Sequence, residues 1–325
     1  MRREGGGVRT AGDHPPSPEE PSAKGSVGLH SESTVANHRA EQVTENCAEH
    51  GEGPVWDETT GQLHWVDMLA GDLLTMAPGG VVGRTKVGTV AAVARPVVGG
   101  GLVLALERGF ALLRPGRQTP ESLPELWNDP SVRMNDGGCD ALGRFYAGSM
   151  AYDESPGRGT LWRLDGELRA EPVLEGVTIS NGLAWTPDGA TAYYVDTPTR
   201  RVDRFDVAPE SGELHGRRPA VRVPEELGAP DGLTLDAEGC LWVALWQGGA
   251  VHRYSPDGEL LTRVELPTPQ VTACAFGGPA LDTLYITTSR QGIEEREDPH
   301  AGALFRFTPG VRGNRVHPFR PEEDV

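Results

Sequence analysis

A short pattern between residues 239 and 258 decides the fold. A turn at Gly239 leads into the β-rich run Leu241-Trp242-Val243-Ala244, and a second run, Gly249-Ala250-Val251-His252-Arg253, leads to the turn Pro256-Asp257-Gly258. An Asp-Gly turn next to short β-rich runs is a strong signal for a β-hairpin. The same order of turn, run, gap and second run occurs six times from Val43 onward.

The repeat has a nearly constant period. Its opening turns are separated by 40, 42, 46, 50 and 43 residues and lie at Gly61, Gly101, Gly143, Gly189, Gly239 and Asp282. A period of roughly 40–50 residues with about four strands is typical of a propeller blade, and six blades close into a ring around a channel. The sequence therefore predicts an all-β protein, a six-bladed β-propeller with four antiparallel strands per blade. The alternative is a β-sandwich with a small second domain.

The N-terminal segment differs in composition from the repeats. Residues 1–44 are rich in Gly, Pro, Ser and Glu, and the first aromatic residue of the chain is Trp56. Such a segment buries too little apolar area to offset its ordering entropy. We therefore expect a disordered tail over residues 1–44 and the propeller domain over residues 45–325.

Charge and cysteine spacing exclude several classes of protein. A net charge of −17 argues against a nucleic-acid partner, which needs clustered Lys and Arg. No apolar stretch approaches the roughly 18 residues that cross a membrane, and no secretory signal is evident. The four cysteines are scattered and form no C-x-x-C pair. We expect a cytoplasmic protein with reduced thiols, and the sequence does not distinguish a monomer from a dimer.

Aligning the repeats on their turns brings polar residues into register. Asp231, Asn181 and Asn135 each lie eight residues before the turn glycine of their own unit. Glu52 lies nine residues before Gly61, because that turn is one residue longer. Since the innermost strand of every blade lines the channel, these four side chains are predicted to meet at one end of it.

The converging side chains predict a cation site. Two carboxylates that face each other repel unless one is protonated or a cation bridges them. Carboxylate and amide oxygens are the donors that hard divalent ions accept, so Ca²⁺, Zn²⁺, Mg²⁺ and Mn²⁺ are all candidates. With so few protein ligands the ion keeps an open position, as a catalytic metal requires. Taken singly, Asn181-Gly182, Asp136-Gly137 and Asp231-Gly232 would be interpreted as turns.

Six short motifs carry a family resemblance over residues 45–318. The chain resembles the gluconolactonase/regucalcin-like (senescence marker protein) family, and all six motifs occur in the order of that family. They are Gly51-Glu52-Gly53-Pro54-Val55-Trp56, Arg133-Met134-Asn135-Asp136-Gly137, Ala147-Gly148-Ser149-Met150, Ser180-Asn181-Gly182-Leu183, Pro230-Asp231-Gly232-Leu233 and Thr288-Ser289-Arg290.

The resemblance implies both a site and an activity. It implies one Ca²⁺, Zn²⁺ or similar ion bound by Glu52, Asn181 and Asp231, and a substrate held by Arg133 and Asn135. Arg133 is indicated by the resemblance alone. Members of this family often hydrolyse aldonolactones, so we expect a hydrolase that opens a small sugar lactone such as gluconolactone to the aldonic acid. Residues 151–156, which vary within the family, are expected to form a lid that sets specificity.

The mechanistic hypothesis assigns the metal and Asp231 separate roles. The ion would polarise the lactone carbonyl, and Asp231 would position or deprotonate the attacking water. Asp136 is the second candidate for a polar role, although its place before Gly137 favours the interpretation of a turn-forming residue. Two alternatives remain open: an organophosphate or aryl-ester hydrolase that uses the same ion, and a non-catalytic propeller that binds Ca²⁺ or a protein partner.

Overall fold

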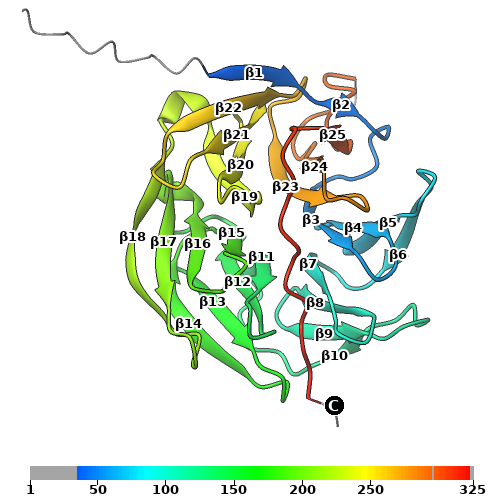
Figure 1. The fold of residues 1–325 in the computed structure, drawn as a ribbon. Coiled ribbons are helices and arrows are strands. Elements are labelled where there is room, and N and C mark those ends of the chain that lie inside the picture. Colours follow the sequence, from blue (N-terminus) through cyan, green and yellow to red (C-terminus); the bar gives the residue numbers. More distant parts are fainter. Residues whose placement is uncertain (1–34, 295, 323–325) are drawn as a thin grey trace, which may run out of the picture. The chain divides into compact units, whose positions relative to one another are not determined.

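The computed structural model describes residues 35–294 and 296–322, and these form six β-sheets around a central axis (Figure 1). Each sheet is one blade with four antiparallel strands, and one of them has a fifth, parallel strand at its edge, which confirms the predicted propeller. Blade 1 contains β3 (Gly51–Asp57), β4 (Gln62–Asp67), β5 (Asp72–Met76) and β6 (Val82–Lys86). Blade 2 contains β7 (Ala91–Pro96), β8 (Leu102–Leu106), β9 (Phe110–Leu113) and β10 (Glu121–Ser122). Blade 3 contains β11 (Val132–Cys139), β12 (Phe145–Ala151), β13 (Gly159–Leu164) and β14 (Ala170–Val177).

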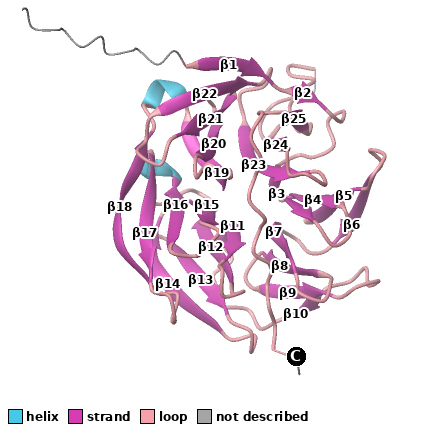
Figure 2. Ribbon diagram, in the orientation of Figure 1, coloured by secondary structure: helices cyan, strands magenta, loops and turns pink. Residues whose placement is uncertain are grey.

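The remaining blades follow the same order from the channel outward. Blades 4 and 5 contain β15 (Ser180–Trp185), β16 (Thr191–Asp196), β17 (Arg201–Val207) and β18 (Leu214–Arg222), and then β19 (Ala229–Leu235), β20 (Leu241–Trp246), β21 (Ala250–Tyr254) and β22 (Leu260–Glu265). Blade 6 contains β23 (Val271–Gly277), β24 (Thr283–Thr288), β25 (Phe305–Phe307) and, as its outermost strand, β2 (Glu41–Gln42). In the described part of the chain the only helices are the 3-10 turns Thr197–Thr199 and Glu225–Leu227 (Figure 2), and neither could span a bilayer.

The N-terminal boundary differs from the sequence-based expectation. Residues 36–42 fall inside the segment expected to be disordered, yet β1 (Ala36–Arg39) pairs in parallel with β22, and β2 pairs with β25. Their side chains are exposed, so composition alone gave no signal for these strands. Main-chain pairing with existing sheet edges holds them, and Arg306 donates two hydrogen bonds to the Glu41 carboxylate of β2. Residues 1–34 lie outside the described residues.

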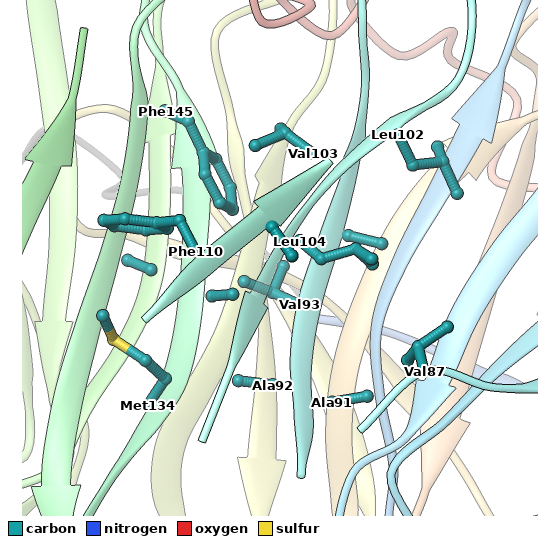
Figure 3. Packing of buried hydrophobic residues seen from close by; sticks show 14 of the residues in the cluster. Val87, Ala91, Ala92, Val93, Leu102, Val103, Leu104, Phe110, Met134 and Phe145 are labelled. Atoms are coloured by element: carbon teal, nitrogen blue, oxygen red, sulfur yellow. The ribbon is translucent and has the colours of Figure 1, made fainter. Parts of the chain in front are cut away.

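The hydrophobic core lies between neighbouring sheets. In blades 2 and 3, Val103 and Leu104 of β8 pack with Phe110 of β9 and Phe145 of β12 (Figure 3). The rings of Phe110 and Phe145 meet edge to face at 5.6 Å. Because strand side chains alternate between the two faces of a blade, each blade is buried against both of its neighbours. The core therefore fixes the inner strands β3, β7, β11, β15, β19 and β23 around the channel (Figure 1).

A C-terminal strap, residues 311–322, crosses the turns at the end of the inner strands (red in Figure 1). Gly313 N donates to Leu281 O at 2.7 Å, and Arg320 N donates to Gly143 O at 2.7 Å, so the strap joins blade 6 to blade 3. Between them Phe319 is fully buried in the core of blades 2 and 3 and bonds to the backbone of Pro96 and Val98. Repeat reasoning did not predict the strap, because it lies outside the repeat.

Replacing Phe319 with alanine is expected to reduce the free energy of unfolding by about 3 kcal/mol, because the change leaves a cavity in a closed core. Val316 of the same strap is 38% exposed. The control Val316→Ala should therefore change stability by less than about 0.5 kcal/mol. Urea unfolding of both variants measures the difference. Equal losses in the two variants would show that Phe319 does not anchor the strap.

Candidate active site

The predicted site residues lie together at one end of the channel. Glu52, Arg133, Asn135, Asn181 and Asp231 all line a single cavity of about 170 Å³. They lie near the first residues of four inner strands, β3, β11, β15 and β19. The C-terminal strap contacts the other ends of inner strands, so the cavity is on the opposite side of the ring. Register between the repeats thus predicted the convergence of these residues.

A β-bulge at the start of each of these strands aims the site residues. In β15 the pairing steps from Ser180 opposite Asp196 to Leu183 opposite Tyr194, so β15 has one residue more than its partner strand. The same extra residue occurs between Glu52 and Val55, between Met134 and Gly137, and between Pro230 and Leu233. Asn135, Asn181 and Asp231 lie inside these bulges and Glu52 directly precedes one. A bulge re-aims the side chains in and beside it, which is how residues of a strand point into the channel.

The bulges also explain the glycines that follow the site residues. A Cβ atom added to Gly182 would lie 2.6 Å from Asp231 O, and one added to Gly232 would lie 2.4 Å from the Cβ of Ala273. Neighbouring inner strands therefore approach so closely that only glycine fits there. The interpretation of Asp136 as a turn former is wrong: Asp136 is buried within β11, and the Asp-Gly and Asn-Gly pairs mark bulges of strands.

The backbone before the bulges is held by buried aspartates from the second strands. Asp67, at the end of β4, accepts hydrogen bonds from the backbone N–H groups of Glu49 and His50, each at 3.0 Å. Asp196, at the end of β16, accepts one from Ile179 N at 2.9 Å. Each aspartate thus fixes the segment that enters an inner strand two residues before Glu52 or Asn181. Sequence reasoning missed these supports, although both occupy the same place in their repeats.

Two buried oxygens at the site have no hydrogen-bond partner among the described residues. These are Oδ1 of Asn181 and Oδ1 of Asp231. The Asn181 amide nitrogen donates to Thr197 Oγ1 at 2.9 Å, which leaves its carbonyl oxygen as the free end of the group. Because an unsatisfied buried oxygen costs free energy, these atoms fit a ligand that accepts oxygen donors.

The carboxylates destabilise one another in the absence of a cation. Burial, together with the Asp136 carboxylate, raises the pKa of Glu52 to about 8. Burial and the charges of Glu52 and Asp136 raise the pKa of Asp231 well above its usual range. Within the described residues no three His, Cys, Asp or Glu side chains form a cation site on their own. The candidate set therefore consists of two carboxylates and the Asn181 carbonyl, and its chemistry fits a divalent ion.

The two residues assigned to substrate by the resemblance contact each other. Arg133 Nη1 donates to Asn135 Oδ1 at 2.6 Å, and Asn135 Nδ2 donates to Ser180 O of the next blade at 2.9 Å. Both side chains are buried, and Arg133 Nε makes no hydrogen bond to any described residue. The pair is therefore fixed before a substrate arrives, with donor capacity left on the guanidinium.

Further residues line the cavity, among them His50 and Trp246, which sequence reasoning did not assign, and Tyr152 of the expected lid. Burial and the nearby Arg133 lower the pKa of His50 to about 3, so its imidazole is neutral. Its Nδ1 lies 2.7 Å from Ser289 Oγ, and its ring meets Trp246 edge to face at 5.9 Å. No spacing rule marks His50, but Ser289 belongs to one of the family motifs.

A family model described as the SMP-30/Gluconolactonase/LRE-like region matches residues 50–290. The chain belongs to this family. The matched range runs from the first residue of the cavity wall in blade 1 to the loop after β24. The family predicted from the six motifs is therefore confirmed, and every member of the predicted site lies inside the matched range.

Relatives of the SMP-30/gluconolactonase family match this chain over most of its length. Pentonolactonase XacC of Haloferax volcanii is 36% identical over 283 residues, which are 84% of this chain and 95% of that protein. Human regucalcin is 35% identical over 287 residues, 83% of this chain and 94% of that protein. The solved structure of regucalcin from Agrobacterium tumefaciens, described as a calcium-binding protein, is 27% identical with a TM-score of 0.83 and covers 88% of this chain and 99% of that one.

A pH-dependent stability is expected from the raised pKa of Glu52. Without a divalent ion, folded Glu52 keeps a proton between its ordinary pKa of 4.5 and about 8, whereas the unfolded chain has released it. The free energy of unfolding should therefore fall as pH rises through this range, and excess Ca²⁺ should remove the fall. Urea unfolding at about pH 5.5 and about pH 8 measures how the free energy of unfolding changes with pH, once with chelator and once with Ca²⁺. An identical change in the two conditions would contradict the site.

Proposed function

We propose that this chain is a metal-dependent lactonase that opens a small sugar lactone to the corresponding aldonic acid. One observation carries the proposal: two buried carboxylates and an unpartnered carbonyl oxygen meet the Arg133–Asn135 pair in one cavity of about 170 Å³. A concave cavity with a few converging polar groups is typical of a small-ligand site rather than of a protein interface. Relatives named pentonolactonase and gluconolactonase support a lactone as the substrate class.

Glu52, Asn181 and Asp231 would hold the ion. When bound, a divalent cation acts as a Lewis acid that favours negative charge on the lactone carbonyl oxygen. All three donors are oxygens, a set that suits Ca²⁺, Mg²⁺ or Mn²⁺ and that Zn²⁺ also accepts. The name of the Agrobacterium relative favours Ca²⁺ among them.

The chain's own residues supply positioning and proton transfer. Asp231 accepts a proton from the attacking water, whose oxygen bonds to the carbonyl carbon; the ring C–O bond then breaks, and the proton goes to the leaving alkoxide. Arg133 and Asn135 donate hydrogen bonds to sugar oxygens and so fix the carbonyl relative to Asp231. His50 is neutral, and so it can donate or accept a hydrogen bond without adding charge to the site.

A pH-stat assay on gluconolactone, arabinonolactone and xylonolactone tests the proposed function. We expect turnover of at least one lactone, loss of that turnover with chelator, and recovery with an added divalent ion. The second candidate, a non-catalytic calcium-binding propeller, is favoured by the description of the Agrobacterium protein. Ca²⁺ binding without hydrolysis of any lactone, with Mg²⁺, Mn²⁺ and Zn²⁺ also supplied, would favour that candidate.

Tyr152 is expected to set substrate affinity. It lies in the segment expected to act as a lid, its ring centroid is 5.6 Å from the Arg133 guanidinium, and its hydroxyl donates to Glu107 Oε1 at 2.8 Å. Replacing Tyr152 with alanine removes one wall of the cavity, so KM should rise about 10-fold with kcat nearly unchanged. Tyr152→Phe keeps the ring and should keep KM close to wild type. A fall in kcat without a change in KM would place Tyr152 in the chemistry instead.

A further inference from the structure

Arg95 is a buried cation on the inner strand of blade 2, between the blades that supply Glu52 and Asn135. Its side chain is 13% exposed. Blade 2 supplies none of the five predicted site residues, because Ala91 and Ala92 stand at the bulge of β7 where blades 1, 3, 4 and 5 have an acid or an amide. Arg95 follows that bulge on the same strand and points toward both neighbouring blades.

The guanidinium of Arg95 connects the bulges on either side. Nη1 donates to Gly53 O in blade 1 at 3.2 Å and to Ala94 O of its own strand at 2.8 Å. Nη2 donates to Gly137 O in blade 3 and lies 3.7 Å from Asp136 Oδ1. A planar fork with several donors can make such bonds in two directions at once, which an ammonium group cannot match.

Both carbonyls belong to the residues that turn the site side chains into the channel. Gly53 directly follows Glu52, has the left-handed backbone (φ 55°), and donates its N–H to Glu52 Oε2 at 2.9 Å. Gly137 follows Asn135 by two residues, and its N–H donates to Asp136 Oδ1 at 2.7 Å. Holding these two peptides therefore fixes the spacing between a proposed ion ligand and a proposed substrate contact.

We propose that Arg95 is a positioning residue for the ion site: its bonds to Gly53 and Gly137 hold the backbone beside the ion ligand Glu52 against the neighbouring blade and so raise the affinity for the ion. The inference rests on the proposed ion site. The proposed role and simple electrostatics predict opposite effects on ion affinity when Arg95 is removed. A positive charge near a cation weakens binding, so removing a mere counter-charge would tighten it. Removing a positioning residue loosens the ligands and weakens it.

Calorimetric titration with Ca²⁺ separates the two roles. Arg95→Met removes the donors and the charge, whereas Arg95→Lys keeps the charge and reaches fewer acceptors. Arg253→Met is the matched control, since Arg253 is also 13% exposed and bonded to an aspartate, Asp236, but it lies in blade 5, and its printed hydrogen bonds go to Asp236 and Glu238 rather than to a bulge of the site. We expect the Ca²⁺ Kd to rise about 10- to 100-fold in Arg95→Met, less in Arg95→Lys, and not at all in Arg253→Met.

Each outcome decides the inference. A Kd that is unchanged or lower in Arg95→Met, or one that rises equally in Arg253→Met, would overturn it. If Arg95→Met does not fold, Arg95→Lys decides in the same way: a raised Kd supports the role and an unchanged Kd contradicts it. If the wild-type protein and the Arg95 variants bind Ca²⁺ equally well, only the role of Arg95 is contradicted and the proposed ion site stands. Wild-type protein that binds no divalent ion removes the proposed ion site as well.

Discussion

Replacing Asp231 with alanine is expected to lower kcat/KM for the lactone at least about 1000-fold, since the change removes both a proton acceptor and an ion ligand. Asp231 is buried in the cavity, and its Oδ1 bonds to no described residue, so its loss removes no hydrogen bond of that oxygen from the fold. The carboxylates of Glu52, Asp136 and Asp231 repel one another, so the loss of Asp231 should leave the metal-free protein slightly more stable. Steady-state kinetics and thermal unfolding measure the two effects.

Two further variants make the Asp231 result specific. Asp188→Ala changes an exposed aspartate in the turn between β15 and β16, far from the cavity lining, and should keep wild-type kinetics. Asp231→Asn keeps the shape and one oxygen donor but cannot accept the proton, so it should stay almost inactive while binding an ion weakly. Activity like that of the wild type in either Asp231 variant would remove this residue from the mechanism.

Ion affinity is expected to fall at least about 100-fold in Glu52→Gln and in Asn181→Ala, because the first replaces a charged ligand with a neutral one and the second removes one of only three protein ligands. Glu52→Gln keeps the side-chain volume and removes the charge, whereas Asn181→Ala removes the unpartnered carbonyl oxygen. Calorimetric titration with Ca²⁺ and with Mn²⁺ measures both. Lactone turnover should return in these variants only at high ion concentration.

The control for this series is Glu49→Gln. Glu49 lies three residues before Glu52 but faces Arg290 outside the cavity, with a carboxylate-to-guanidinium distance of 2.8 Å. The same change of charge at Glu49 should leave the ion Kd within about twofold of wild type. A loss of affinity as large as in Glu52→Gln would mean that net charge, rather than coordination, governs binding.

The fold and the convergence of the site could be predicted because both follow from repetition. Turn glycines such as Gly143 and Gly239, with φ of 82° and 78°, recur in five of the six blades, and equivalent strand positions must meet in a closed ring. The equivalent positions of Glu52 and Asp231 in their repeats could therefore be recognised in the amino-acid sequence. Residues 36–42 were not predictable in this way, because exposed edge strands need only backbone hydrogen bonds.

The supports of the site could not be predicted from position in the repeat alone. Arg95 lies three residues after Ala92, so an alignment that compared only the bulge positions passed over it. Asp136 was interpreted as a turn residue because a bulge and a turn use the same Asp-Gly pair for different reasons. His50 has Ile179 at the equivalent place of blade 4, so no repeated residue type marked it, whereas Tyr152 lies in the segment 151–156 that was expected to form a lid.

Anomalous diffraction from crystals soaked in Mn²⁺ tests the central claim most directly. The account predicts one strong peak at the mouth of the channel, within coordination distance of Glu52, Asn181 and Asp231, and its loss in Glu52→Gln. A well-ordered channel with no peak among these three side chains, or a peak bound only elsewhere on the protein, would contradict it.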